Sequence, residues 1–371
     1  MRVFVFAGVT CALAMPACGA SLKIGKSEAG LNILSFEGYA QNDWVKPFEA
    51  QTGCKVVRSY AGSTDEMLTL MKTGGGAQYD VVSAGADSAQ RLIADRAVQP
   101  LKMSLIPAWH DFLPPLQSPA FNTVHGVHYG ISYEWGPNLL MFNSSKLTPA
   151  PISWAAIYDK AHAGAIVVPD NVMQIADAAQ YLSVAEPTLG IKDPYELTQK
   201  QMDRVEALLS AQKPLVKAYW AVASDQIDWF KTGSAVIGPS WPYMINALKA
   251  ANIPVAETMP AEGATAWADS WMITAKAAHP NCAYQWINFV STPLVQAQQA
   301  LSFGETPANG SACAEMNKIT PGSCSHYHAD AGPEYLDKIH FYKLPQKQCG
   351  NGHNDCLDFD AWRQVWQRVR G

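Results

Sequence analysis

The segment Trp267-Ala268-Asp269 places an indole ring and a carboxylate two residues apart, just before an expected strand at 271–274. The π face of tryptophan attracts a cation, and a carboxylate forms charge-assisted hydrogen bonds with an ammonium group. The chain contains 12 Trp, 14 Tyr and 12 Phe, so most of these rings are expected in packed cores, and one Trp alone is weak evidence of a site. An acid beside a Trp is more specific, and it predicts a site for a small molecule that carries positive charge.

The sequence carries none of the familiar catalytic motifs. It has no Gly-x-Ser-x-Gly, no His-Glu-x-x-His and no phosphate-binding loop of the Gly-x-x-x-x-Gly-Lys-Ser/Thr type. The triplet Gly74-Gly75-Gly76 is interpreted as the end of a helix, and His125 and His128 lie in a Gly-rich turn that favours a solvated loop over a metal site. We therefore predict no catalytic residue, no metal ligand and no cofactor.

Composition limits the class of protein. The chain has 371 residues, of which 48% are hydrophobic and 16% charged, which is enough apolar material for the packed cores of two domains. A mean hydropathy of -0.07 excludes a protein with many membrane spans. The net charge of -5 leaves no basic stripe for phosphates, so a nucleic-acid partner is not expected.

The first twenty residues have the layout of a secretory signal peptide. Met1-Arg2 is followed by an apolar run over 3–15 and by small residues at 17–20, and the run is too short to remain in a bilayer. We expect cleavage after Ala20 and a periplasmic protein. The alternative is a lipid tether at Cys18, although the residues before Cys18 fit a lipoprotein cleavage box poorly.

Cysteine number agrees with export. Eight cysteines are present and six follow the signal, an even number that indicates disulfides in an oxidising compartment. Spacing suggests two local loops and one long-range bond, although six cysteines allow fifteen connectivities. The suggested pairs are Cys313–Cys324, Cys349–Cys356 and Cys54–Cys282. The rival interpretation is a metal site, because His326, His328 and His353 lie among the last four cysteines.

The N-terminal part alternates strands and helices at short spacing. In chain order, the expected elements are strand 31–36, helix 43–52, strand 54–57, helix 64–71, strand 79–82 and helix 89–95. This pattern predicts a parallel sheet covered by helices, in which ligands bind beyond the carboxyl ends of the strands. Those ends lie at 36–39, 61–64 and 83–87.

After residue 100 the pattern is less regular. Strands are expected at 127–132, 139–142, 166–168, 235–238 and 271–274, and helices at 170–183, 203–212, 225–232, 284–290 and 295–302. The segment Tyr133-Glu134-Trp135-Gly136 is expected to separate two strands. The tail after 311 is expected to hold two short helices.

Six segments together resemble the periplasmic polyamine-binding proteins of bacterial ABC transporters. They are 32–39, 62–71, 79–82, 133–136, 233–241 and 263–272, in matching order across about 30–340. The resemblance implies an α/β, two-lobed periplasmic-binding-protein fold of type II with two crossover segments. It also implies a first lobe of 29–138 plus 268–313 and a second lobe of 139–267 plus 314–371.

The resemblance also implies a set of ligand-binding positions between the lobes. They are Phe36, Tyr39, Asp87, Trp135, Asp170, Trp241, Trp267, Asp269 and Glu305. Phe36 stands where many members have Trp, and the acid often found one turn after Asp170 is replaced by Met173. Asp170 follows Pro169 and is equally consistent with a helix N-cap.

By the same resemblance, the chain is expected to be the solute-binding component of an ABC importer. It would capture putrescine, spermidine or a related small amine, as a monomer, and deliver it to a membrane permease. One alternative ligand is a zwitterion such as 4-aminobutyrate, for which Lys213, Lys217 or Arg58 would supply a cation. Another class, an exported metal-assisted hydrolase that uses the His and Cys residues of the tail, also stays open.

Overall fold

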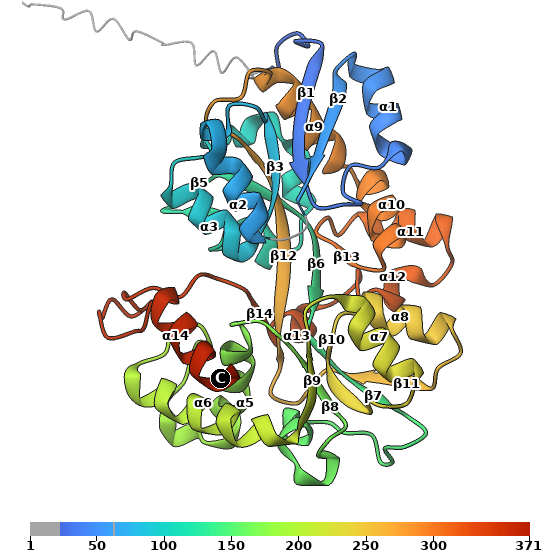
Figure 1. Cartoon of the computed structure of the whole chain (residues 1–371). Helices are drawn as coiled ribbons and strands as arrows, with labels where there is room; N and C mark the ends of the chain where they lie inside the picture. Colours follow the sequence, from blue (N-terminus) through green and yellow to red (C-terminus); the bar gives the residue numbers. More distant parts are fainter. Residues whose placement is uncertain (1–22, 62–63) are drawn as a thin grey trace, which may run out of the picture.

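Two β-sheets, each flanked by helices, divide the chain into two lobes (Figure 1). This is a computed structural model that describes residues 23–61 and 64–371. The expected signal peptide lies outside the described residues. No helix within the described ranges is long and apolar enough to cross a membrane.

The first sheet has seven strands in the order β13-β6-β12-β3-β1-β2, with β14 paired to β12. Its strands are β1 Gly30–Ser35, β2 Lys55–Tyr60, β3 Val81–Gly85, β6 Gly130–Pro137, β12 Ala264–Ile273, β13 Thr306–Pro307 and β14 Ile339–Phe341. Its early helices are α1 Asn42–Thr52, α2 Thr64–Lys72 and α3 Ala86–Ala94. β1 pairs in parallel with both β2 and β3, which confirms the predicted alternation of strands and helices.

The second sheet has five strands in the order β11-β7-β10-β8-β9. They are β7 Leu139–Asn143, β8 Ile166–Pro169, β9 Val216–Trp220, β10 Ile237–Ser240 and β11 Val255–Thr258. Its longer helices are α5 Gln174–Ala185, α6 Gln199–Gln212, α7 Ala223–Lys231, α8 Pro242–Ala250 and α14 Phe359–Arg370. β9 and β11 were not predicted from the sequence, since β9 is only half-buried and lacks a clear apolar pattern.

β6 and β12 run between the two lobes as neighbouring antiparallel strands (Figure 1). Their register extends from Ala266 opposite Pro137 to Met272 opposite Gly130, with a shift between Asp269, opposite Glu134, and Ser270, opposite Ser132. The predicted break at 133–136 is therefore wrong, because this segment lies inside β6. All eight residues of β6 are buried, so the strand lacks the polar alternation of a half-exposed strand and the acid at Glu134 interrupts its apolar pattern.

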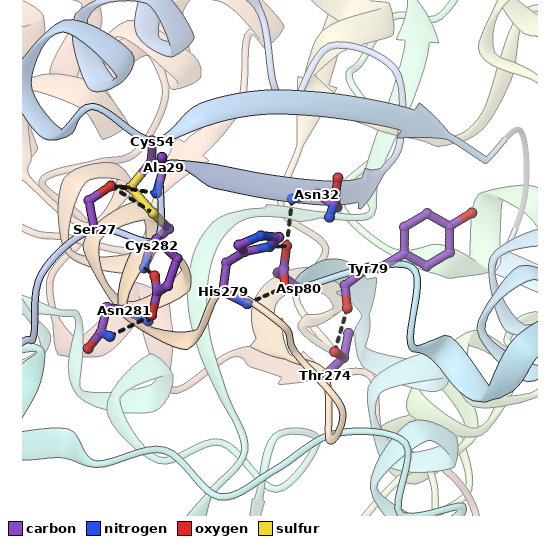
Figure 2. A network of polar contacts seen from close by, with 11 residues as sticks. Ser27, Ala29, Asn32, Cys54, Tyr79, Asp80, Thr274, His279, Asn281 and Cys282 are labelled. Atoms are coloured by element: carbon purple, nitrogen blue, oxygen red, sulfur yellow. Dashed lines mark hydrogen bonds and ion pairs between the residues drawn. A yellow bond between two sulfur atoms is a disulfide. The ribbon is translucent and has the colours of Figure 1, made fainter.

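The buried carboxylate of Asp80 links β1 to the segment before α9 (Pro280–Val290), where the chain returns to the first lobe (Figure 2). Asp80, just before β3, accepts a hydrogen bond from the Asn32 backbone N–H at 2.7 Å and one from the His279 backbone N–H at 2.8 Å. His279 Nδ1 also lies 2.8 Å from Asp80 Oδ2. His279 precedes α9, so one side chain joins β1, β3 and α9.

The C-terminal segment contributes to both lobes. α11 (Ala312–Ile319) and α12 (Ser323–His326) form one apolar cluster with α10 (Pro293–Phe303), and the expected lobe boundary at 313 falls inside α11. α14 packs on α5 and α6 through a second cluster. With α13 (Pro333–Leu336), the tail has four helices where two were expected.

The short elements between β3 and β6 are α4 Pro114–Gln117, β4 Thr123–Val124 and β5 Val127–His128.

Three disulfides connect the six cysteines that follow the expected signal. The bonds are Cys54–Cys282, Cys313–Cys324 and Cys349–Cys356, at sequence separations of 228, 11 and 7. Cys54 and Cys282 are fully buried and join the start of β2 to α9. The long-range bond therefore adds a covalent link beside the Asp80 contacts (Figure 2).

The long-range disulfide is expected to stabilise the fold more than the shortest one. Cys54→Ser/Cys282→Ser should lower the free energy of unfolding by about 2–5 kcal/mol, because the bond closes a long loop in the unfolded chain. Cys349→Ser/Cys356→Ser, which opens a separation of seven residues, should lower it less. Denaturant titration under non-reducing conditions measures both, and equal losses would contradict the loop-length argument.

Candidate functional site

A cavity of about 370 Å³ lies where residues of both lobes meet. Among the residues that the structure describes, its lining is aromatic and acidic and contains no Lys or Arg. The lining residues are Phe36, Tyr39, Thr64, Gly85, Ala86, Asp87, Asn171, Met173, Trp241, Trp267, Asp269, Glu305 and Tyr342. The volume suits a small molecule, and the lining chemistry suits a positively charged one.

Tyr39 and Asp269 form the central polar contact of the cavity wall. The Tyr39 hydroxyl donates a hydrogen bond to Asp269 Oδ2. Both side chains are 7% exposed, and Tyr39 is held from behind by Trp44 Nε1, which donates to the Tyr39 carbonyl at 3.0 Å. Edge-to-face contacts with Tyr133 at 5.0 Å and Phe303 at 5.3 Å fix the Tyr39 ring. This packing fixes the Tyr39 ring, whose hydroxyl bonds to Asp269.

A glycine on β6 makes room for Trp267. A Cβ atom at Gly136 would lie 2.6 Å from the Trp267 indole, so only glycine allows this ring to lie across the neighbouring strand. On the second lobe, Trp241 immediately precedes α8 and packs edge-to-face on Trp220 at 5.0 Å. Phe36 follows β1 and packs edge-to-face on Tyr39 at 6.0 Å. Aromatic side chains from both lobes therefore border the cavity.

The wall carries three carboxyl groups: Asp269 is buried, and Asp87 and Glu305 are partly buried. Burial raises the pKa of Asp269 to about 7; the Tyr39 hydrogen bond lowers it and the charge of Asp87 raises it further. Burial, together with the charge of Asp269, also holds the pKa of Glu305 well above its usual range. Because no basic side chain lines the cavity, a bound cation would supply the charge that favours ionisation of these acids.

Tyr342 reaches the cavity from the tail, and a polar network positions it. Asn138 Nδ2 donates to the Tyr342 hydroxyl at 2.8 Å and to Thr265 Oγ1 at 2.6 Å. Thr265 Oγ1 in turn donates to Asp177 on α5. Asn138 and Thr265 lie where the crossover strands enter the second lobe, so the network joins the crossover to α5 and to the tail. Burial raises the pKa of Asp177 to about 7, although its hydrogen bonds oppose the shift.

Seven of the nine expected ligand residues line the cavity and two do not. Trp135 is fully buried, its ring lies edge-to-face on Phe341, and its Nε1 donates to the Pro307 carbonyl at 3.3 Å. Trp135 stands opposite Ala268 in the register, one residue out of phase with Trp267 and Asp269, so it projects to the other face of the sheet. It is a core residue.

Asp170 forms an ion pair instead of lining the cavity. Arg370 on α14 donates from Nε at 2.9 Å and from Nη2 at 2.8 Å to its two carboxylate oxygens. The Arg370 guanidinium also stacks on Tyr219 at 3.7 Å. Asp170 does not cap a helix either, because α5 begins four residues later, at Gln174. The partner is 200 residues away in sequence, and no local pattern signals it.

Sequence reasoning missed several lining residues. Thr64 and Asn171 have small polar side chains in loops or at a helix start, and the sequence gives no reason to choose them over similar neighbours. Met173 was noted only as the place of a missing acid. Tyr342 lies beyond the segments that carry the resemblance, and only the folding of the tail over the crossover brings it to the cavity.

Within the described chain, one group has three potential metal-ligating atoms within 4.8 Å of one another. It consists of Cys349, Asp355 and Cys356, but its two sulfurs are joined in a disulfide, so neither is a thiolate. His326 lies 2.9 Å from Asn246 Oδ1, and His328 stacks on Tyr335. The histidines of the tail thus do not converge on this group.

Comparison with known proteins decides the family. Residues 43–320 match the family of bacterial extracellular solute-binding proteins. The chain belongs to this family. The match covers most of the chain and agrees with the two-lobed fold, and a solute-binding protein of this kind is extracellular or periplasmic.

Relatives and structural neighbours of this solute-binding protein agree with one another. A putrescine/cadaverine-binding protein of Pseudomonas aeruginosa is 25% identical over 290 residues, 73% of this chain and 78% of the relative. The putrescine-binding periplasmic protein of Escherichia coli K12 is 25% identical over 287 residues, 72% and 74% of the two chains. A spermidine/putrescine ABC transporter substrate-binding protein of Streptococcus pneumoniae superposes with a TM-score of 0.75 at 18% identity, over 92% and 98% of the chains. The last comparison shows the shared fold.

Buried acids make the stability of the ligand-free solute-binding protein depend on pH. The pKa of Asp269 is about 7 in the folded state against 3.8 ordinarily, so its contribution to stability is complete below about pH 4 and is lost as the pH rises through 7. Asp269→Asn should therefore be more stable than the parent at pH 8, by about 1–4 kcal/mol, and the difference should shrink toward pH 5. Denaturant titrations across this range test it, with Asp170→Asn as the control; a difference that does not vary with pH would contradict it.

Proposed function

We propose that this protein captures a small amine with two or more ammonium groups outside the cytoplasm and delivers it to the permease of an ABC importer. The observation that carries the proposal is the cavity lining. It combines the rings of Phe36, Trp241 and Trp267 with the carboxyl groups of Asp87, Asp269 and Glu305, and it lacks a basic side chain. Ammonium groups pair with such carboxylates, and the methylenes between them pack on the rings.

The named relatives support the same ligand class. The two curated relatives bind putrescine, and one of them also binds cadaverine. Both ligands are linear diamines, which match a cavity that has acids and aromatic faces but no cation. We propose a polyamine of this kind as the solute, bound in the periplasm.

The mechanism we propose is capture between the lobes followed by closure. β6 and β12 connect the lobes, so small changes at residues such as Asn138 and Thr265 would rotate one lobe against the other. A ligand that contacts Asp269 on the first lobe and Trp241 on the second would favour the closed form through contacts that the open form lacks. The permease would then recognise the closed form.

A zwitterionic ligand such as 4-aminobutyrate is less well matched. Its carboxylate would need a cation or several donors, and the cavity lining offers only neutral donors such as Thr64 and Asn171. None of the three basic residues considered from the sequence is among the described residues that line the cavity: Lys213 donates to the Arg370 carbonyl, Arg58 donates to the Ala40 carbonyl, and Lys217 is exposed on β9. A metal-assisted hydrolase would need a metal centre in the tail, where the cysteine thiols are consumed in disulfides.

Asp269 is expected to be the main partner of an ammonium group. Asp269→Asn should weaken putrescine binding at least about tenfold, because it removes one partner of a desolvated charge pair and leaves the other unpaired. Asp170→Asn changes a carboxylate that is paired with Arg370 outside the cavity lining, and it should leave the affinity within about twofold. Calorimetric titration of both variants measures this. Equal losses would mean that Asp269 does not contact the ligand, and a parent that prefers 4-aminobutyrate would reject the polyamine.

Ligand binding is expected to close the lobes and to change tryptophan fluorescence. Saturating putrescine should reduce the radius of gyration measured by small-angle scattering. It should also change the emission, because Trp241 and Trp267 border the cavity. Trp267→Phe should diminish the fluorescence change, whereas Trp362→Phe, on the buried face of α14, should not. An unchanged radius of gyration with bound ligand would rule out capture by closure.

A further inference from the structure

Glu134 is a buried acid for which the family resemblance gives no function. It lies in the middle of β6 and is 0% exposed. Neither of its carboxyl oxygens has a hydrogen-bond partner within residues 23–61 and 64–371. Burial of an unpaired acid costs stability, so its presence in the core calls for a compensating interaction.

Strand register places Glu134 on the face of the sheet that borders the cavity. Glu134 is opposite Asp269, and Gly136 is opposite Trp267, on the antiparallel pair of β6 and β12. Residues directly opposite each other project to the same face of a sheet. Trp267 and Asp269 line the cavity, so the Glu134 carboxyl is directed to that side and lies beneath the lining.

Glu134 belongs to a row of acids: Glu134 lies on β6 and Asp269 on β12, whereas Glu305 directly precedes β13 and Asp87 follows β3, in the first turn of α3. On the other side, β13 pairs Pro307 with Glu134, and Glu305 lies two residues earlier on the cavity wall. Beyond Asp269, a Cβ atom at Gly85 on β3 would lie 3.2 Å from Asp269 Oδ1 and 3.1 Å from Asp87 Oδ1. In sheet order the row is Glu305, Glu134, Asp269 and Asp87.

We propose that Glu134 is a specificity-determining residue of the cavity, a carboxyl group behind Asp269 and Glu305 that favours ligands with two positive charges over ligands with one. The proposal rests on the proposed function and refines its ligand class.

Charge balance is the physical reason why Glu134 would favour ligands with two positive charges. One ammonium group compensates one carboxylate, and like charges on neighbouring strands oppose further ionisation. The cavity lining supplies no Lys or Arg to neutralise the remainder of the row. A second ammonium group therefore allows a further acid of the row to ionise, and Glu134 lies between the two lining acids, Glu305 and Asp269.

The raised pKa of Glu134 in the ligand-free state agrees with a carboxyl group that ionises only when a second ammonium group binds. Burial, and then the charges of Glu305 and Asp269, hold the pKa of Glu134 well above its usual range. The other titratable groups around it are Tyr39 and Tyr133, whose pKa values burial raises, and Asp87 beyond Asp269. When a diamine binds, a carboxyl of the row gives its proton to solvent and the resulting carboxylate remains beside the ammonium group. Binding should therefore release protons near neutral pH.

The test compares two ligands of equal length and different charge, putrescine and butylamine, on the parent and on Glu134→Gln. Glutamine keeps the shape of a protonated glutamate but cannot ionise. We expect Glu134→Gln to weaken putrescine binding at least fivefold and butylamine binding less than twofold. Calorimetry in two buffers of different ionisation enthalpy should show fewer protons released per putrescine bound by the variant. Asp170→Asn is the matched control and should change neither quantity.

The possible outcomes distinguish failure of the Glu134 assignment from failure of the proposed function. Equal weakening of both ligands, or no weakening of either, would overturn the assignment of Glu134. Putrescine binding by the parent without any buffer dependence would overturn it as well, and this measurement needs no variant to fold. In both cases the proposed function survives if the parent binds putrescine. If the parent binds neither putrescine nor spermidine, the proposed function fails and the inference fails with it.

Discussion

The antiparallel pairing of β6 with β12 is the constraint on which the rest of the molecule depends. These two strands lie in the first sheet, pass between the lobes, and present one face to the cavity. Their register decides which side chains border the ligand space and which enter the core. A shift of β12 by one residue would exchange Trp267 and Asp269 for Ala268 on the cavity face, and a shift of β6 would turn Trp135 toward the cavity. Buried packing on both faces of β6 makes such a shift costly.

The same pairing concentrates acids in a cavity wall where no Lys or Arg is found among residues 23–61 and 64–371. Some acids elsewhere in the described chain have close partners: backbone N–H groups and His279 contact Asp80, and Arg370 pairs with Asp170. The cavity wall instead holds carboxyl groups whose ionised forms are disfavoured by burial. A solute with ammonium groups removes this penalty. Burial of these acids lowers the stability of the ligand-free wall, and under the proposed function a cationic ligand would compensate this cost.

The tail links the second lobe to the cavity. α14 packs on α5 and α6, Arg370 holds Asp170, and Tyr342 is positioned by Asn138 beside the crossover. The long disulfide and the Asp80 contacts stiffen the first lobe (Figure 2). Rigid lobes joined by two strands are suited to movement as units, which is what closure around a solute requires.

Local sequence patterns determined the alternation of strands and helices before residue 95 and the even set of cysteines. Trp267 and Asp269 were recognisable because a ring and an acid occur together beside a strand. The remaining lining residues that were predicted came from family resemblance. Resemblance indicates which positions match the family, but not which side chains those residues contact in this protein. This is why the same resemblance also selected Trp135 and Asp170.

Only the tertiary structure decided the face on which Trp135 and Glu134 lie and the partner that Asp170 takes. Strand register sets the first, and it depends on pairing between segments more than 100 residues apart in sequence. Packing of α14 sets the second, across 200 residues. Tyr342 entered the cavity for the same reason, since folding of the tail over the crossover strands brought it there. Local sequence encodes hydrophobic periodicity and turn chemistry. The pairing of charges and the face of the sheet that a side chain occupies depend on contacts that form only when the chain is folded.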